Sequence, residues 1–297
     1  MRPGLAYAIS DAFYGERLDL SARQAPGQGW AAMPEVAQAQ RLREHGASPA
    51  EVRFFITFTA AMDRARDAGR LWTRSGDLFL GQRQMFDPDR VVEFQRGELD
   101  RALRESGVSQ RHSLDAWAWR TIATSIAANA SPEVSAAIAH GNGDAQVLLR
   151  ATRRRNSGGE ALFPMLAGPK VGPMWVRMLS MPGEANLQNL SSLPVSVDVH
   201  VRRVTENLGM AATHGRELDA IRRTIQAAWT ADVHNHGSAG PAPLSNTCAG
   251  LDPAIWFVGK WGCSYCERSG TRLRVAEFCQ ACTFTPEADG GRSLASW

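Results

Sequence analysis

The chain reads Leu166-Ala167-Gly168-Pro169-Lys170-Val171-Gly172 and, further on, Leu193-Pro194-Val195-Ser196-Val197-Asp198-Val199-His200-Val201-Arg202-Arg203-Val204. The first stretch is a glycine-containing turn, and it predicts a helix over 160–166, a hairpin within 164–175 and a second helix over 170–180. A helix N-terminus reached through a glycine turn presents free backbone N–H groups, which suit a DNA phosphate. The second stretch places an aspartate at the start of a predicted helix over 197–208, where it can cap the helix or face a cleft.

Helical signals recur along most of the chain. Ser48-Pro49-Ala50-Glu51 has the form of a helix start, because serine can cap, proline suits the first turn and glutamate follows three residues after the serine. Other helices are expected over 33–44, 93–105, 132–140, 215–231 and 251–260, and from Ser113 and Asp144. Only Leu193–Val199 alternates as a strand does. The sequence therefore predicts an all-α fold.

The two quoted stretches resemble motifs of the helix–hairpin–helix DNA glycosylase superfamily, which includes endonuclease III and the 8-oxoguanine glycosylases. Members carry a hairpin close to Leu-Pro-Gly-Val-Gly-x-Lys, followed by a segment close to Val-Asp-x-His-hydrophobic-x-Arg-Val. Residues 197–204 fit the second motif almost position by position, and Gly168 and Lys170 match the last glycine and the lysine of the first. The resemblance implies a helix–hairpin–helix glycosylase fold.

The hairpin departs from the family's pattern at three positions. Leu166 stands where the first glycine is usual, and Met165 stands where proline is usual. Pro169 removes one N–H donor beside the hairpin. Residues 181–192 lengthen the usual gap between the two motifs.

The resemblance implies that Lys170 and Asp198 form a catalytic pair. Base excision breaks the C1′–N bond of a nucleotide that has been flipped out of the duplex, and the sugar then gains cationic character. The carboxylate of Asp198 would stabilise that charge, and the neutral amine of Lys170 would attack C1′ to form a Schiff base. The expected function is a DNA glycosylase of base-excision repair with AP-lyase activity. The alternative mechanism is monofunctional, with a water positioned by Asp198.

The expected partner is double-stranded DNA that contains a damaged or modified base. The resemblance assigns DNA contacts to Gly168, Gly172, His200, Arg202 and Arg203. Further arginine clusters at 150–155 and 222–223 can hold phosphates, or can equally be solvated helix faces. The net charge of +3 is compatible with nucleic-acid binding.

We expect a monomer in the cytoplasm, associated with the nucleoid. No run of uncharged apolar residues is long enough to span a membrane, and the first residues lack the form of a secretory signal. No membrane partner is therefore expected.

Two CxxC pairs near the C-terminus are a strong metal signal, and their members are Cys263, Cys266, Cys279 and Cys282. Spacing alone favours a zinc ribbon or knuckle. Residues 251–260, however, resemble the helix that leads into the iron–sulfur loop of endonuclease III-like enzymes, although those enzymes use a different cysteine spacing. A [4Fe–4S] cluster is therefore the expected cofactor, and structural zinc is the alternative. Cys248 is expected to be a plain thiol.

Three regions are expected along the chain. Residues 1–50 would form an N-terminal extension that packs on the helical domains, 51–215 the glycosylase core, and 216–297 the C-terminal helices with a small four-cysteine metal-binding module. Two other functions remain open on the same helical scaffold: a DNA-binding protein without catalysis, and a base-modifying enzyme acting on hypermodified thymines. The sequence does not indicate which base is excised.

Overall fold

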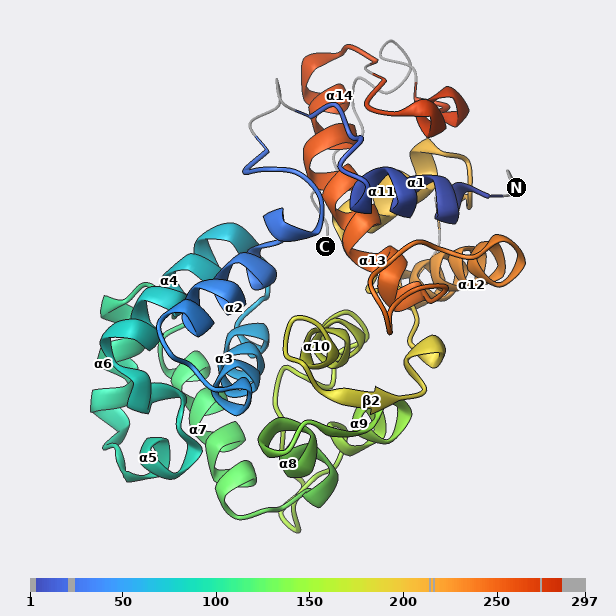
Figure 1. The fold of residues 1–297 in the computed structure, drawn as a ribbon. Helices are drawn as coiled ribbons and strands as arrows, with labels where there is room; N and C mark the ends of the chain where they lie inside the picture. The colour runs from blue at the N-terminus through green and yellow to red at the C-terminus, as the bar shows by residue number, and fades with distance from the viewer. Residues whose placement is uncertain (1–3, 21–24, 214, 216, 273, 285–297) are drawn as a thin grey trace. The chain divides into compact units, whose positions relative to one another are not determined.

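The computed structural model describes residues 4–20, 25–213, 215, 217–272 and 274–284 (Figure 1). Helices account for 62% of the chain and strands for 3%, which confirms the all-α class. The chain forms two compact units, one made of residues 1–33 with 190–297 and the other of residues 34–189. These bounds differ from the three consecutive regions expected from the sequence, because the N-terminal segment belongs to the same unit as the C-terminal third.

The continuous unit is a helical domain with one very small sheet. Two three-residue strands, β1 (Asn142–Asp144) and β2 (Asn186–Gln188), pair in parallel with Asn142 opposite Asn186. The other elements are helical: α2 (Pro34–Glu44), α3 (Pro49–Ala61), α4 (Ala68–Gly81), η3 (Arg83–Phe86), α5 (Pro88–Glu93), α6 (Arg96–Glu105), α7 (Ser113–Ala127), α8 (Pro132–Ala139), α9 (Ala145–Ala151) and α10 (Val171–Ser180).

Helix α3 is the centre of this unit, and it packs against α2, α4, α7, α8 and α10. Its start is a capping box, in which the Ser48 hydroxyl accepts from the Glu51 N–H at 3.3 Å and the Glu51 carboxylate accepts from the Ser48 N–H at 2.9 Å. The predicted start of this helix is confirmed. Its buried face contributes Phe58, whose ring stacks on Trp119 at a centroid distance of 4.8 Å. Helix α3 is thus the central helix of the unit, against which the other helices pack.

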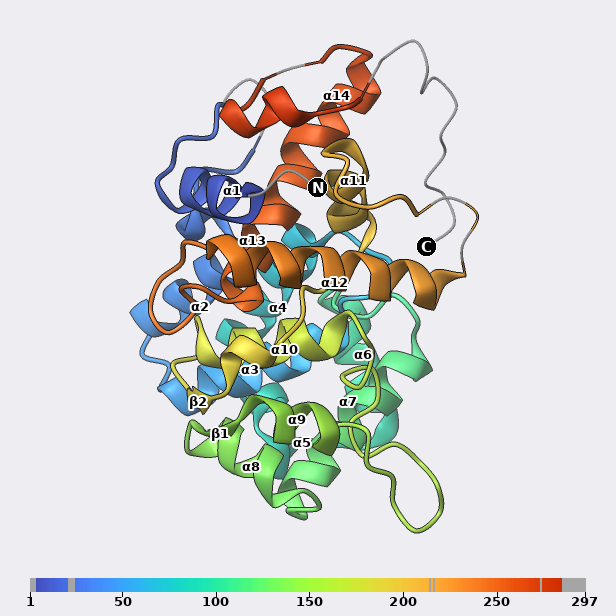
Figure 2. The same ribbon diagram turned by 90° about the vertical axis from the view of Figure 1, so that its right-hand side faces the viewer.

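The discontinuous unit is built around α13 (Cys248–Phe257), which packs on α1 (Leu5–Tyr14), α11 (Val199–Asn207) and α12 (Leu218–His236) (Figure 2). A π-helical turn, η5 (Val258–Cys263), continues α13 without a break, and α14 (Ser264–Ser269) follows it. Short 3-10 turns complete the unit: η2 (Trp30–Ala32), η4 (Leu190–Ser192) and η6 (Glu277–Ala281). The N-terminal helix α1 is linked to α13 by the Tyr14 hydroxyl, which donates to the Gly250 carbonyl at 2.8 Å.

Two sequence predictions about the motif region are wrong. Residues 160–166 are turns rather than a helix, because the chain folds back on itself through an antiparallel bridge between Arg155 and Ala161, and Met165 adopts a left-handed backbone with φ 71°. Only the second helix of the expected helix–hairpin–helix is present, as α10. Residues 193–198 form no strand; instead the Ser196 N–H donates to the Asp252 carboxylate at 2.6 Å.

Candidate functional site

Lys170 is the N-cap residue of α10 and lies in the continuous unit. Its Nζ is 3.4 Å from Oδ2 of Asp63, which follows α3 in the chain. The Lys170 side chain is 29% exposed, whereas that of Asp63 is only 7% exposed. The lysine is therefore held against a buried carboxylate while part of it remains accessible to solvent, which is the access that a nucleophile needs.

The hairpin before α10 has fewer free N–H groups than the sequence motif suggests. The Gly172 N–H already donates to the Gly168 carbonyl at 2.8 Å, and Pro169 and Pro173 have none. Pro169, Gly172 and Pro173 therefore offer no N–H group to an anion. The expected phosphate contact at Gly168 and Gly172 therefore has a weaker backbone basis here than in a hairpin without prolines.

The two glycines of the hairpin differ in why the fold needs them. A Cβ at Gly172 would lie 3.0 Å from the Leu166 carbonyl oxygen and 3.3 Å from Cδ2 of Leu149, so the close approach of α10 to this turn requires glycine. A Cβ at Gly168 would meet nothing closer than 3.9 Å. The structure thus gives a packing reason for Gly172 and no steric reason for Gly168.

Asp198 is the N-cap residue of α11 and lies in the discontinuous unit. Its Oδ1 accepts from the backbone N–H groups of His200 at 2.8 Å and Val201 at 3.0 Å. Its Oδ2 accepts no hydrogen bond from any residue that the structure describes. The side chain is half-buried. One oxygen is thus fixed by the helix, and the other is available to a cationic centre.

The residues after Asp198 make a network on α11. The Nδ1 of His200 lies 3.1 Å from Nη1 of Arg203, and Nε of Arg203 donates to Glu267 at 2.7 Å. The His200 ring meets Trp256 edge to face at 5.8 Å. These contacts set the orientation of His200 through residues of the same unit.

The predicted DNA contacts Arg202 and Arg203 are both engaged within the protein. Nε of Arg202 donates to Glu206 at 2.8 Å and to Thr213 at 3.1 Å. The side chains of Arg202 and Arg203 are only 14% and 11% exposed. Both arginines therefore stabilise α11 and its surroundings, and a phosphate would have to compete with their acidic partners.

The four cysteines of the two CxxC pairs line one small cavity, together with Asn207, Leu208, Val258, Gly262, Val275, Phe278 and Phe284. None of them forms a disulfide. Burial raises the pKa of the Cys263 thiol well above its usual range, and the other three thiols raise it further. Burial also raises the pKa of Cys279. The structure thus places the thiols of both CxxC pairs around the same cavity.

As a donor set, four thiols fit either a [4Fe–4S] cluster or zinc. In the part of the chain that the structure describes, no three His, Cys, Asp or Glu side chains are arranged so that they could hold a metal ion. The described residues therefore include suitable donor atoms, but these are not arranged as metal ligands. The metal centre stays a prediction. Cys248 lies apart from this cavity and is buried, with its sulfur 3.6 Å from the Thr230 hydroxyl.

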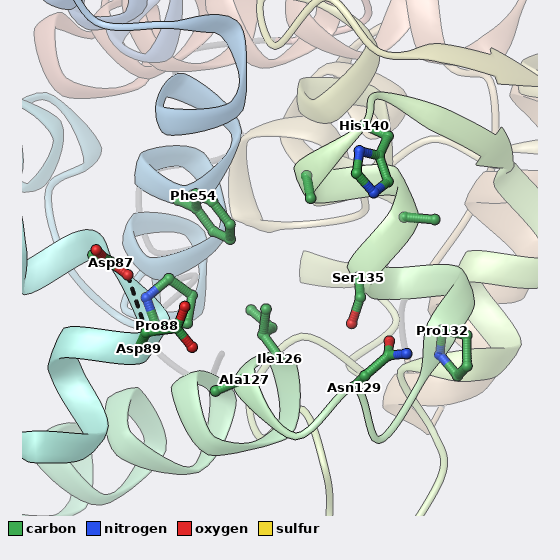
Figure 3. A pocket seen from close by; sticks show the side chains of 12 residues that line it. Phe54, Asp87, Pro88, Asp89, Ile126, Ala127, Asn129, Pro132, Ser135 and His140 are labelled. Atoms are coloured by element: carbon green, nitrogen blue, oxygen red, sulfur yellow. Dashed lines mark hydrogen bonds between the residues drawn. The ribbon is translucent and has the colours of Figure 1, made fainter.

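A second concavity, of about 470 Å³, lies in the continuous unit between α3, α7, α8 and the start of α5 (Figure 3). Phe54 covers one side of it, and Asp87 and Asp89 lie on another, as Figure 3 shows. The lining residues in the described part of the chain include no lysine or arginine. Carboxylates without a neighbouring cation repel phosphate, so this groove is not suited to bind the DNA backbone.

The sequence motifs did not indicate two residues that the structure places against the candidate site. Asp63 contacts Lys170, and Glu267 contacts Arg203. Asp63 lies 107 positions from Lys170, and Glu267, although it directly follows Cys266, lies 64 positions from Arg203. Asp63 stands in Met62-Asp63-Arg64, directly after the apolar helix α3, and this position is a sequence signal for it.

No helix in the described residues has the length and apolar character needed to cross a membrane. The chain matches no protein-family model, no curated protein and no solved structure.

Proposed function

We propose that this protein is a DNA glycosylase that flips a damaged or modified base out of double-stranded DNA and excises it, with Lys170 and Asp198 as catalytic residues. The observation that carries the proposal is the state of Asp198. It stands at the start of α11 within the Val-Asp-x-His motif, with Oδ1 fixed by two N–H groups and Oδ2 without a bonded partner among the described residues. A carboxylate fixed in this way is suited to stabilise a charge that develops only in the transition state.

In the proposed reaction, the C1′–N bond weakens and positive charge develops on the sugar. Oδ2 of Asp198 stabilises that charge. Because Oδ1 is already oriented by the helix, little reorganisation is needed when the charge appears. Asp198 thus supports either a lysine nucleophile or an attacking water.

Lys170 determines the reaction type. Its amine, once neutral, attacks C1′ and forms a Schiff base, which permits later strand cleavage. The partial exposure of Lys170 supports this role, and its place at the N-terminus of α10 matches the motif. If the amine does not attack, the enzyme is monofunctional and Lys170 contacts a phosphate.

The four cysteines are proposed to hold a [4Fe–4S] cluster, with structural zinc as the alternative. Either group, bound to the four thiolates, would cross-link the segment that contains the two CxxC pairs and so stabilise its fold. It would take no part in the reaction at the base. Glu267, which follows Cys266 directly, is the partner of Arg203. The folded module would thereby fix Arg203 and, through it, the ring of His200.

A panel of duplexes, each with one damaged or modified base, tests the proposal. Release of a base, detected by alkaline cleavage of the strand, supports it. A covalent adduct that borohydride traps with wild type and not with Lys170→Gln identifies the nucleophile. Tight duplex binding without release from any duplex would indicate a DNA-binding protein, and a changed but retained base would indicate a base-modifying enzyme. Either of these outcomes contradicts the proposed excision.

A further inference from the structure

Asp63 is a buried acid with a specific cationic partner. It follows the last turn of α3, and its own N–H donates to the Ala60 carbonyl at 3.1 Å, so its position is fixed by the helix end. Its Oδ2 faces Nζ of Lys170 at 3.4 Å, and both residues lie in the continuous unit. A carboxylate that is 7% exposed is rarely buried without a role for its charge.

Arg66 is a second charged group close enough to Asp63 for the two to interact electrostatically. Burial lowers the pKa of Arg66, whereas Asp115 and Asp63 raise it. The Nη1 of Arg66 is directed to the Val108 carbonyl at 2.5 Å. Asp63 makes its ion pair with Lys170 rather than with this arginine.

A lysine paired with a carboxylate is an ammonium, and an ammonium has no lone pair with which to attack C1′. The proposed nucleophile therefore has to lose a proton before it can react. Oδ2 of Asp63 is an acceptor that lies 3.4 Å from Nζ. A proton can pass directly between these two atoms once they approach to ordinary hydrogen-bonding distance.

We infer that Asp63 is a positioning residue for Lys170 that also accepts the proton from its ammonium, an inference that rests on the proposed function. The carboxylate takes one proton, and the nitrogen lone pair forms the bond to C1′ while the C1′–N bond to the base breaks. The base leaves with that electron pair and takes up a proton. When the sugar ring opens, the nitrogen loses a second proton and O4′ gains one, which leaves an iminium. The two protons lost by the ammonium thus match those gained by the base and O4′, and Asp63 ends as a carboxylate.

The inference predicts a direction of change that a purely structural ion pair does not. If Asp63 only restrains Lys170, then Asp63→Asn removes a charge that stabilises the ammonium, and the neutral amine becomes more abundant at any given pH. Schiff-base formation would then be faster, or would extend to lower pH. If Asp63 accepts the proton, the same substitution slows the reaction and shifts it to higher pH, where solvent removes the proton instead.

The experiment is borohydride trapping on a duplex with one abasic site, a probe that does not depend on which base the enzyme excises. Trapping rates of the full chain are measured from about pH 6 to about pH 9 under single-turnover conditions. We expect Asp63→Asn to trap about 100-fold more slowly than wild type at neutral pH, with recovery at the alkaline end. Asp63→Glu, which keeps a carboxylate, should restore much of the neutral rate.

Glu184→Gln is the matched control. It breaks the ion pair between Glu184 and Arg43, which lies in the same unit. The side chain of Arg43 is 30% exposed, close to the 29% of Lys170. The trapping profile of Glu184→Gln should match wild type. Equal or faster trapping by Asp63→Asn at neutral pH overturns the inference and leaves the glycosylase proposal standing. Base release by a wild type that is never trapped overturns the inference as well, because no amine attack occurs. A wild type that neither releases a base nor is trapped contradicts the proposed function itself.

Discussion

Asp198 has two carboxylate oxygens in different environments, and this difference allows its structural and chemical roles to be separated. Asp198→Asn keeps an oxygen that can accept from the His200 and Val201 N–H groups, because asparagine caps helices about as well as aspartate. The amide carries no charge to stabilise a sugar cation. We expect base release to fall by at least about 100-fold while duplex affinity and the melting temperature stay close to wild type.

Asp198→Ala serves as the comparison, because it removes the cap and the charge together. It should lower the free energy of unfolding by about 1 kcal/mol in addition to abolishing release. Single-turnover excision and thermal unfolding of both variants give the two quantities separately. Excision by Asp198→Asn within a few-fold of wild type would remove Asp198 from the mechanism.

The sequence predicted which residues are candidates for catalysis and DNA binding, but it did not predict which side chains contact them. Lys170 and Asp198 stand out because they fall at fixed places in short motifs. Their partners do not, since Asp63 meets Lys170 only through the packing of α3 on α10. The same limit applies to Arg203, whose pairing with Glu267 depends on how α14 lies beside α11. Its interpretation as a free DNA contact therefore missed an internal ion pair.

At the scale of elements, capped helices were predictable and turns were not. The start of α3 followed from four adjacent residues, because a capping box is a local interaction. The turns over 160–166 depend on pairing between Arg155 and Ala161 and on an unusual backbone at Met165, neither of which apolar periodicity indicates. The hairpin geometry was therefore the least predictable part of the candidate site.

The cap of α3 gives a pH prediction. The Glu51 carboxylate accepts from Arg83 and from the Ser48 N–H, and these bonds lower its pKa to about 2. A depressed folded-state pKa contributes stability that is fully present above the ordinary value of 4.5 and is lost as the pH falls toward about 2. The melting temperature of Glu51→Gln should therefore lie below that of wild type at neutral pH, and the gap should narrow as the pH falls through this window. A gap that is the same at both ends would show that the cap does not depend on charge.

The four-cysteine cavity gives the second prediction at this scale. If it holds a [4Fe–4S] cluster, the purified protein is brown, absorbs near about 400 nm and contains about four irons per chain. Cys263→Ser or Cys279→Ser should then lower solubility and duplex affinity, whereas Cys248→Ser, outside the cavity, should retain the full metal content. A colourless protein with about one zinc per chain would show that the CxxC spacing was the better guide, and a protein without metal would contradict both.

At the scale of the whole molecule, the N-terminal helix α1 belongs to the same unit as the C-terminal part of the chain from Leu190 onward. Asp232 of α12 makes this link: its side chain is fully buried, and it accepts from the Gly4 N–H at 3.1 Å and from the Ala6 N–H at 2.7 Å. An anion at the start of a helix is stabilised by the free N–H groups there. Nothing in the sequence of residues 1–50 indicated this partner, because the interaction joins residues more than two hundred positions apart.

Removal of this anion should destabilise the unit that carries Asp198 and the cysteines. Asp232→Ala leaves two N–H groups of α1 without their acceptor, and the loss of hydrogen bonds to a charged group should lower the free energy of unfolding by about 2–3 kcal/mol. Asp219→Ala is the control on the same helix. Its side chain is 75% exposed and forms an exposed ion pair with Arg222, so the expected change is within about 0.5 kcal/mol. Urea unfolding gives the energies, and limited proteolysis shows whether α1 is released first.

Since α1 packs on α13, which leads through η5 into the first CxxC pair, its release should also make the Cys263 thiol more reactive toward alkylating reagents in metal-free protein. Equal unfolding energies and equal cleavage of α1 in the two variants would mean that the N-terminal helix is held by its apolar contacts alone.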